Sequence, residues 1–140
     1  MQTSFTDKQL LDKDNKSSES ILRKCVHCGM CNATCPTFCV NGEELEGPRG
    51  RIYLIKDMLE NKKPANKKVV KHIDSCLSCY SCMTTCPSGV NYMHLIDHGR
   101  NYVEETYKRP FFDRLFRNVL SFVLPRPKVF LALAYLSKLI

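Results

Sequence analysis

Two stretches of this chain share one cysteine spacing. Residues 25–36 are CVHCGMCNATCP, and residues 76–87 are CLSCYSCMTTCP. Each stretch, called a cysteine run below, has the form C-x2-C-x2-C-x3-C-P, and the second follows the first at a shift of 51 residues, from Cys25 to Cys76. An internal repeat of a whole motif indicates two similar sites in one fold. The two runs therefore decide both the fold and the chemistry.

The cysteine count leaves two explanations open. Nine cysteines in 140 residues indicate either a disulfide framework or a metal protein. Residues 1–20 are polar and contain no apolar segment of the kind found in a secretory signal. We therefore expect a cytoplasmic protein, in which disulfides are disfavoured. An odd number of cysteines also fits paired disulfides poorly.

The spacing of the runs is the pattern of bacterial two-cluster ferredoxins. Three thiolates at i, i+3 and i+6 surround one face of an iron–sulfide cube, and the stiff chain sends the fourth to the other cluster. Structural zinc usually needs only two separated Cys-x2-Cys pairs around one ion. The sequence thus predicts two [4Fe–4S] clusters whose ligands cross between the runs. The predicted ligands are Cys25, Cys28, Cys31 and Cys86 for the first cluster, and Cys76, Cys79, Cys82 and Cys35 for the second.

Residues near the runs have secondary roles in this interpretation. Cys39 is left out of the repeat, because its counterpart 51 residues on is Val90, and we expect it to be a small buried hydrophobe. Gly29 would let its backbone amide approach cluster sulfur. Tyr80 and Met83 are expected to cover the clusters against water. The proline after each fourth cysteine is expected to stop a helix.

The rest of the sequence predicts a mainly α fold. No long alternating strand pattern occurs, whereas apolar residues recur at helical spacing between and after the runs. We expect a polar tail over residues 1–17, a helical ferredoxin-type domain over residues 18–110 and an amphipathic helical arm over residues 111–140. The expected helices are Ile21–Lys24 (capped by Ser17 or Ser18), Arg51–Glu60 (with Pro48 in its first turn), Asn66–Asp74, Tyr92–Lys108, Phe111–Leu124 and Val129–Ile140.

Charge and hydropathy say less about partners. The formal net charge of +7 is offset in part if anionic clusters are bound, and nothing resembles a nucleic-acid-binding module. No apolar run is long enough to span a bilayer. Residues 109–140 mix basic with apolar residues and fit a membrane surface, but we favour packing in a core or against a subunit. The basic stretch of Lys62, Lys63, Lys67, Lys68 and Lys71 is expected to be solvated, with docking to an acidic partner as the alternative.

Three segments carry a resemblance to a known family. They are LRKCVHCGMCNATCPTF (residues 22–38), GEELEGPRGRIYLIKDMLE (residues 42–60) and HIDSCLSCYSCMTTCPSGVNY (residues 72–92). Together with RPFFDRLFRNVL and PRP further on, they resemble the iron–sulfur subunits of glycolate oxidase (glycolate dehydrogenase). The linker between the runs is similar to that of the helical ferredoxin fold in succinate dehydrogenase, anaerobic glycerol-3-phosphate dehydrogenase and heterodisulfide reductase subunits.

The resemblance implies a role in electron transfer. An FAD-containing subunit would oxidise glycolate to glyoxylate, and this chain would relay the electrons singly towards a quinone pool at the inner face of the cytoplasmic membrane. The chain itself shows no catalytic acid, base or nucleophile set. The family continues into a cysteine-rich region with paired CCG motifs that these 140 residues lack, so we expect a fragment or a split or truncated gene product.

Other functions stay open. The same domain would serve a lactate or glycerol-3-phosphate dehydrogenase or a heterodisulfide-reductase-like complex. A different class of function is a sensor or structural module, whose clusters would report oxygen or order the fold without carrying electrons. A free two-cluster ferredoxin is less favoured, because the long linker and the apolar arm suit a dedicated subunit.

Overall fold

The fold is helical throughout the residues that the structure describes. The computed structural model describes residues 1–137, and within them it contains helices and turns but no strand. The mainly α class is thus confirmed. The chain divides into two compact units, Met1–Tyr107 and Lys108–Ile140, and each is described by itself below.

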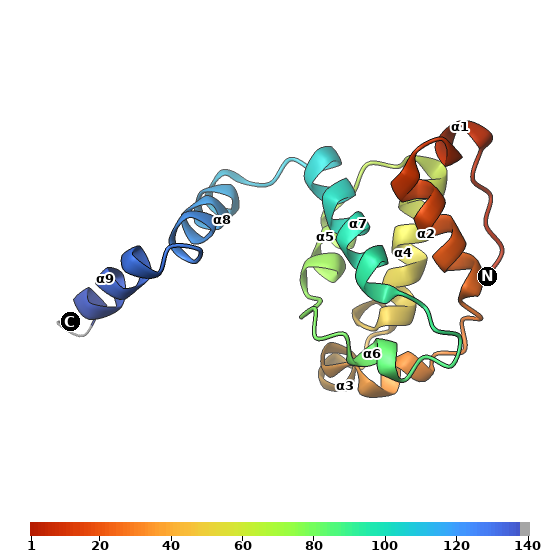
Figure 1. Cartoon of the computed structure of the whole chain (residues 1–140), viewed down its shortest axis with the longest axis horizontal. Coiled ribbons are helices and arrows are strands. Elements are labelled where there is room, and N and C mark those ends of the chain that lie inside the picture. Colours follow the sequence, from red (N-terminus) through yellow and green to blue (C-terminus); the bar gives the residue numbers. More distant parts are fainter. Residues whose placement is uncertain (138–140) are drawn as a thin grey trace. The chain divides into compact units, whose positions relative to one another are not determined.

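Three helices form the body of the first unit. These are α2 (Lys13–Lys24), α4 (Pro48–Asn61) and α7 (Tyr92–Thr106), which contact one another side by side (Figure 1). A shorter helix, α5 (Lys67–Asp74), packs on α4 and α7. Burying one Leu, Ile or Val side chain contributes roughly 1.5–3 kcal/mol, and these helices bury many of them. The fully buried apolar side chains are Leu22, Ile55, Ile73, Leu95, Ile96 and Val103.

The cysteine runs lie at one end of this body, the lower end in Figure 1, together with several short elements. These elements are η1 (Met30–Thr34), α3 (Pro36–Asn41), η2 (Glu44–Glu46) and α6 (Ser81–Thr84). Pro36 stands in the first turn of α3, directly after Cys35. The proline therefore begins a helix where we expected it to stop one, since a first-turn residue needs no backbone N–H partner.

The N-terminal segment differs from the expected polar tail. It forms α1 (Asp7–Leu10) and the first turns of α2, which is capped by Asp12 accepting a hydrogen bond from the Asn15 N–H at 3.1 Å. Neither expected cap is used, and Ser18 is fully buried. Gln9 is also buried, and its amide donates to the Leu59 carbonyl at 2.8 Å. Hydrogen bonds such as this one attach the segment to the rest of the first unit. The hydrophobic pattern of the sequence does not reveal such bonds, which is why a polar tail was expected.

The helices between and after the runs agree with the prediction. Pro48 opens α4, and the side chain of Asn66 caps α5 by accepting a hydrogen bond from the Val69 N–H at 3.0 Å. Helix α7 ends at Thr106, a short distance before the Arg109–Pro110 pair. The prolines thus mark these boundaries as expected, while the cap at Asn66 was not predicted.

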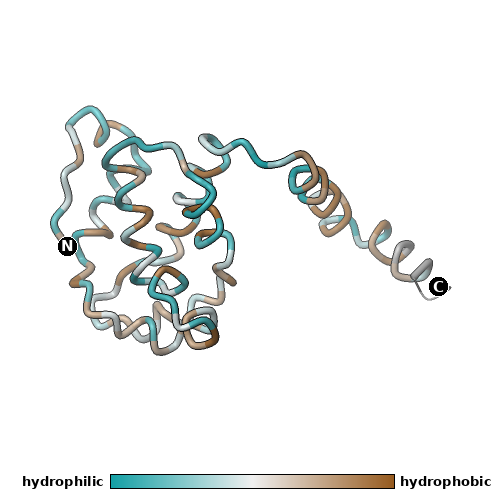
Figure 2. The backbone as a smooth tube through the Cα atoms, turned by 180° about the vertical axis from the view of Figure 1, so that it is seen from behind, coloured by the Kyte–Doolittle hydropathy of each residue, from teal (hydrophilic) through white to brown (hydrophobic). Residues whose placement is uncertain are grey.

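The second unit consists of α8 (Phe111–Val123) and α9 (Pro127–Ser137). Helix α8 is confirmed within one residue, while α9 begins earlier than predicted and residues 138–140 lie outside the described range. Hydrophobic and hydrophilic residues alternate along the coils of α8 (Figure 2). The apolar side chains that we expected in a core are exposed: Phe111, Phe112, Leu115, Phe116, Val119 and Phe122.

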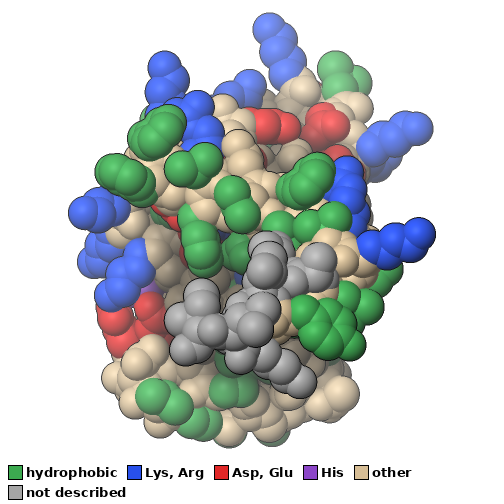
Figure 3. Space-filling view, turned by 90° about the vertical axis from the view of Figure 1, so that its left-hand side faces the viewer, with side chains coloured by type: hydrophobic (Ala, Val, Ile, Leu, Met, Phe, Trp, Pro, Cys, Tyr) green, Lys and Arg blue, Asp and Glu red, His purple; other side chains and the backbone are tan. Residues whose placement is uncertain are grey.

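The surface of the molecule therefore carries a large amount of apolar area. Figure 3 shows hydrophobic side chains at the surface, and Lys and Arg side chains that project into solvent. Packing against a subunit stays a prediction for α8. Within residues 1–137, none of the helices has both the length and the apolar character that a bilayer crossing requires.

Candidate metal centres

The eight cysteines of the runs line two cavities, and each cavity takes cysteines from both runs. Three cysteines of the first run and one of the second line the first cavity: Cys25, Cys28, Cys31 and Cys86. Three cysteines of the second run and one of the first line the second cavity: Cys76, Cys79, Cys82 and Cys35. Cys82 also borders the first cavity. This grouping supports the crossed ligand sets, which stay a prediction.

A thin wall separates the two cavities. Pro48, Cys82 and Tyr92 line both of them. Tyr92 is 4 % exposed, and its hydroxyl lies 3.6 Å from the Cys76 sulfur. Burial raises the pKa of Tyr92, so the wall presents a neutral phenol to the sulfur atoms. The two sites are therefore neighbours that share Pro48, Cys82 and Tyr92 in their linings.

The two runs have the same backbone turns. His27 (φ 59°) and Ser78 (φ 52°) occupy equivalent positions of the repeat, and both are left-handed. Gly29 (φ 84°) and Tyr80 (φ 57°) form a second equivalent left-handed pair. A non-glycine residue in this conformation costs about 1–2 kcal/mol. The runs accept this strain at three residues, and thereby present their cysteines with one common geometry.

The repeat also meets itself in space. The Thr85 hydroxyl donates to the Thr34 hydroxyl at 3.2 Å, and these two residues are exactly one repeat apart. The Thr34 hydroxyl in turn donates to the Ser81 carbonyl at 3.3 Å. Equivalent residues of two copies touch only near the axis that relates the copies. The two copies of the repeat therefore meet where η1 contacts α6, which brings each run close to the cavity of the other.

Burial favours the neutral form of two thiols that line the cavities, Cys31 and Cys82. Burial, with repulsion from the Cys25 thiolate, raises the pKa of Cys31 to about 11. Burial, with repulsion from the Cys31 and Cys76 thiolates, raises the pKa of Cys82 to about 12. Such thiols lose their protons at neutral pH only when a metal cation replaces the proton. Sulfur-only donor sets select iron–sulfur clusters or zinc, so the residues present fit a cluster.

Arg49 borders the first cavity and explains part of the need for Gly29. A Cβ atom on Gly29 would lie 2.5 Å from Nη1 of Arg49. The Arg49 guanidinium pairs with Glu44 at 2.6 Å, and this hydrogen bond raises its pKa, with smaller contributions from the Cys31 and Cys28 thiolates. Gly29 therefore makes room for a cation at the rim of the first cavity.

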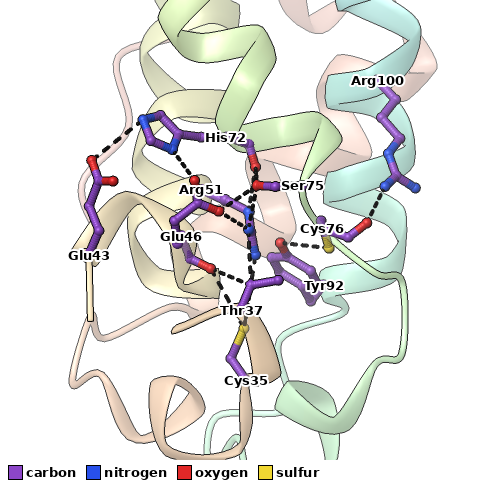
Figure 4. A network of polar contacts seen from close by, with 10 residues as sticks. All are labelled: Cys35, Thr37, Glu43, Glu46, Arg51, His72, Ser75, Cys76, Tyr92 and Arg100. Atoms are coloured by element: carbon purple, nitrogen blue, oxygen red, sulfur yellow. Dashed lines mark hydrogen bonds and ion pairs between the residues drawn. The ribbon is translucent and has the colours of Figure 1, made fainter. Parts of the chain in front are cut away.

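Arg51 is the centre of a buried polar network beside the second cavity (Figure 4). Its guanidinium donates to the His72 carbonyl at 2.6 Å, to Glu46 Oε2 at 2.9 Å and to the Ser75 hydroxyl at 3.0 Å. Its Nη1 lies 3.9 Å from the Cys35 sulfur. The Arg51 side chain is 1 % exposed. This one residue joins α4, η2 and α5 to a cysteine of the first run.

Glu46 supplies the negative charge of the network. Burial opposes its charged form, but hydrogen bonds from Ser75 and His72, and the charges of His72 and Arg51, hold its pKa below the ordinary value. His72 Nδ1 lies 2.7 Å from Glu46 Oε1, and His72 Nε2 lies 3.7 Å from Glu43. Glu43, Glu46 and His72 are close enough to share a metal ion. Because Glu46 is already bonded to Arg51 and Ser75, we assign the group to the ion-pair network.

The network was missed from the sequence, although one signal was present. Arg51 precedes Ile55 by four residues, so it lies on the apolar stripe of α4 that continues to Met58 and Leu59. A charged residue in a buried stripe needs a buried partner. The acidic segment just before α4, which holds Glu46, was the nearest source of one.

The structure also bears on the roles predicted for Cys39, Tyr80 and Met83. The prediction that Cys39 is buried is wrong: it is exposed, and its thiol donates to the Ala33 carbonyl at 3.5 Å. The reason is that α3 buries none of its residues. Tyr80 lines the second cavity, as expected of a cover, whereas Met83 is partly buried against the hydrophobic core.

Comparison with known families places the chain among iron–sulfur proteins. The family model described as "4Fe-4S dicluster domain" matches residues 21–90. The chain belongs to the 4Fe-4S dicluster domain family. The matched range of this dicluster domain contains both cysteine runs and the linker between them.

Several curated proteins are similar to the chain over this domain and beyond it. The glycolate oxidase iron-sulfur subunit of Escherichia coli is 52 % identical over 133 residues, which are 95 % of this chain and 32 % of that protein. A probable glycolate oxidase iron-sulfur subunit of Bacillus subtilis is 32 % identical over 117 residues, 80 % of this chain and 26 % of that protein. The chain thus spans at most about a third of these relatives.

A more distant relative has another name. The mitochondrial succinate dehydrogenase iron-sulfur subunit of Candida glabrata is 27 % identical over 84 residues, 56 % of this chain and 33 % of that protein. No solved structure matches the chain significantly.

Proposed function

We propose that this chain transfers electrons through two [4Fe–4S] clusters as part of an iron–sulfur subunit in a glycolate-oxidising complex. The observation that carries the proposal is that each of the two cavities is lined by three cysteines of one run and by at least one cysteine of the other. The similarity to the Escherichia coli glycolate oxidase subunit supports glycolate as the source of the electrons.

The chain's own residues hold, cover and space the two sites. When bound, clusters of this kind accept and release single electrons. Cys25, Cys35 and Cys82 are buried, which limits the access of water to part of each site. Neither cavity has a carboxylate in its lining. Oxidation of the substrate would therefore take place on an FAD-containing partner subunit.

The partners and the location follow from the same proposal. Electrons would leave the chain towards a quinone acceptor at the inner face of the cytoplasmic membrane. The exposed apolar side chains of α8 provide a surface for a partner subunit or for peripheral contact with the membrane. The succinate dehydrogenase relative supports the type of cofactor only, because it shares just over half of this chain.

The first experiment is anaerobic purification of the chain, followed by iron and zinc analysis and EPR. We expect about eight irons per chain in two four-iron clusters. About four irons, or zinc in their place, would contradict the two-cluster proposal. A chain that holds two clusters which no flavin partner reduces would be a structural or sensing module instead.

The second experiment tests the substrate. The purified chain is mixed with its flavin partner, and cluster reduction is followed after addition of glycolate, lactate or glycerol 3-phosphate. We expect glycolate to reduce the clusters fastest. Reduction by one of the other two compounds, with the clusters left oxidised by glycolate, would replace the substrate and keep the electron-transfer role.

A further inference from the structure

Two arginines at the start of α4 lie at different cavities. Arg49 lines the first cavity and Arg51 lines the second. Residues i and i+2 of a helix lie on different sides of it, and Pro48, at the same helix start, borders both cavities. The first turn of α4 therefore stands between the two sites and gives one guanidinium to each.

The surroundings of the two guanidinium groups differ strongly. The Arg51 side chain is 1 % exposed, whereas that of Arg49 is 34 % exposed. A charge surrounded by protein acts on its neighbours more strongly than a charge in contact with water and salt. The Arg51 Nη1 also points at a predicted ligand, since it donates to the Cys35 sulfur at 3.9 Å.

The counter-charge of Arg51 lies on its other side. Glu46 accepts from Nη2 of Arg51 at 2.9 Å and also binds Ser75 and His72, whereas Nη1 is the nitrogen that lies near Cys35 (Figure 4). The guanidinium thus meets the sulfur through one nitrogen and the Glu46 carboxylate through another. The Glu46 backbone carbonyl, 3.7 Å from that sulfur, accepts the Thr37 hydroxyl at 2.7 Å, which offsets part of its negative potential.

A further arginine adds positive charge to the second run. Arg100 donates to the Cys76 carbonyl at 2.7 Å and to the Ser78 hydroxyl at 2.6 Å. The second site thus has a buried arginine at one ligand and a partly buried arginine at the backbone of another. The first site has the exposed Arg49, paired with Glu44.

We propose that Arg51 is a positioning residue that raises the reduction potential of the cluster held by Cys35, Cys76, Cys79 and Cys82 above that of the other cluster. Adding an electron makes a cluster more negative, and a buried positive group beside a ligand sulfur favours that form. Electrons then pass from the first site to the second. This inference rests on the proposed function, because it requires both clusters.

The test is a redox titration of the full chain followed by EPR, with two matched double variants. Arg51→Gln with Glu46→Gln removes the buried pair without leaving an unpaired buried carboxylate. Arg49→Gln with Glu44→Gln removes the exposed pair at the first cavity. We expect the first double variant to change the oxidised-to-reduced ratio of one cluster about tenfold at its original midpoint, a fall of about 59 mV for a one-electron couple.

The remaining variants distinguish an effect on the reduction potential from a loss of folded structure. The double variant of Arg49 and Glu44 should lower the reduction potential of the cluster at the first cavity. This shift should be smaller than the one that the Arg51 double variant causes at the second. Arg51→Lys keeps the charge, so it should restore most of the original potential even if the polar network is disturbed. The inference is overturned if both potentials stay in place in Arg51 variants that retain about eight irons, or if the same potential moves in both double variants. Wild-type protein without two clusters would instead refute the proposed function itself.

Discussion

Cys86 shows how a single residue can belong to one run and serve the other. It is the fourth cysteine of the second run, yet it lines the first cavity. We expect Cys86→Ala to remove the cluster of Cys25, Cys28 and Cys31 and to lower the iron content by about half or more, because the sites share a wall. Iron analysis and EPR measure this loss.

The matched control for this variant is the ninth cysteine. Cys39 is exposed and lines neither cavity, so Cys39→Ala should keep the full iron content. A Cys86→Ala protein that keeps both clusters would show that the ligand sets do not cross in this way.

Gly29 combines a left-handed backbone with a close neighbour. At φ 84°, alanine costs about 1–2 kcal/mol, and its Cβ would also meet the Arg49 guanidinium. We expect Gly29→Ala to lower the free energy of unfolding of the cluster-loaded protein by more than this backbone cost alone. Denaturant unfolding under anaerobic conditions gives the value.

Gly42 separates the two causes of this loss. It has φ 66° and no atom within 4 Å of an added Cβ, so Gly42→Ala should show the backbone cost only. Adding Arg49→Ala to the Gly29→Ala protein should recover the steric part. Equal losses at both glycines would mean that Arg49 moves aside freely.

At the level of elements, α2 and α7 are joined by a contact that depends on pH. His98 Nδ1 on α7 lies 2.7 Å from the Ser18 hydroxyl on α2. Burial lowers the pKa of His98, with repulsion from His94 in the same direction, although Asp14 and other acidic groups oppose the shift. The unfolded chain therefore takes up this proton first as the pH falls through about 6.5, so the folded state loses stability below that pH.

The corresponding variant is His98→Gln, which cannot take up the proton. We expect its thermal unfolding temperature to fall less than that of the wild type between about pH 7 and pH 5. Ser18→Ala is the control: it removes the hydroxyl and keeps the titrating ring, so it should retain the pH dependence at a lower overall stability. Parallel curves for wild type and His98→Gln would exclude His98 as the cause.

Sequence patterns located most elements of this fold, and the exceptions share one cause. Helices α4, α5 and α7 combine an apolar stripe with a proline or asparagine boundary, and both signals are visible in the sequence. Helix α1 and the first turns of α2 lie in a polar segment that hydrogen bonds such as that of Gln9 with Leu59 hold in place, and the apolar contacts of α2 come from Ile21 and Leu22 near its end. The same holds for the site: cysteine spacing gave the candidate ligands, while Arg51 depends on partners from three elements that only the folded chain brings together.

On the scale of the whole molecule, the first unit carries both candidate sites. Residues Met1–Tyr107 form a compact unit, and every residue that lines the two cavities belongs to it. We therefore expect a chain that ends at Tyr107 to bind as much iron as the full chain. Iron analysis and the EPR spectrum of the purified shortened chain test this expectation, and a loss of either cluster would contradict it.

The second unit should govern association. Helix α8 exposes a row of apolar side chains, which favours self-association or partner binding. Leu115→Asp with Phe116→Asp should reduce association in size-exclusion chromatography and leave the iron content unchanged. If these substitutions release iron, α8 supports the sites after all.

The sharing of each cavity between the two runs also sets an order for biosynthesis. The first run leaves the ribosome well before the second, but on the proposed ligand sets its three thiols would lack their fourth partner until Cys86 has been translated. The second predicted set would be complete a few residues earlier, because Cys82 is the last of its members to be translated. On the proposed ligand sets, neither cluster would be fully ligated on a nascent chain that lacks the second run.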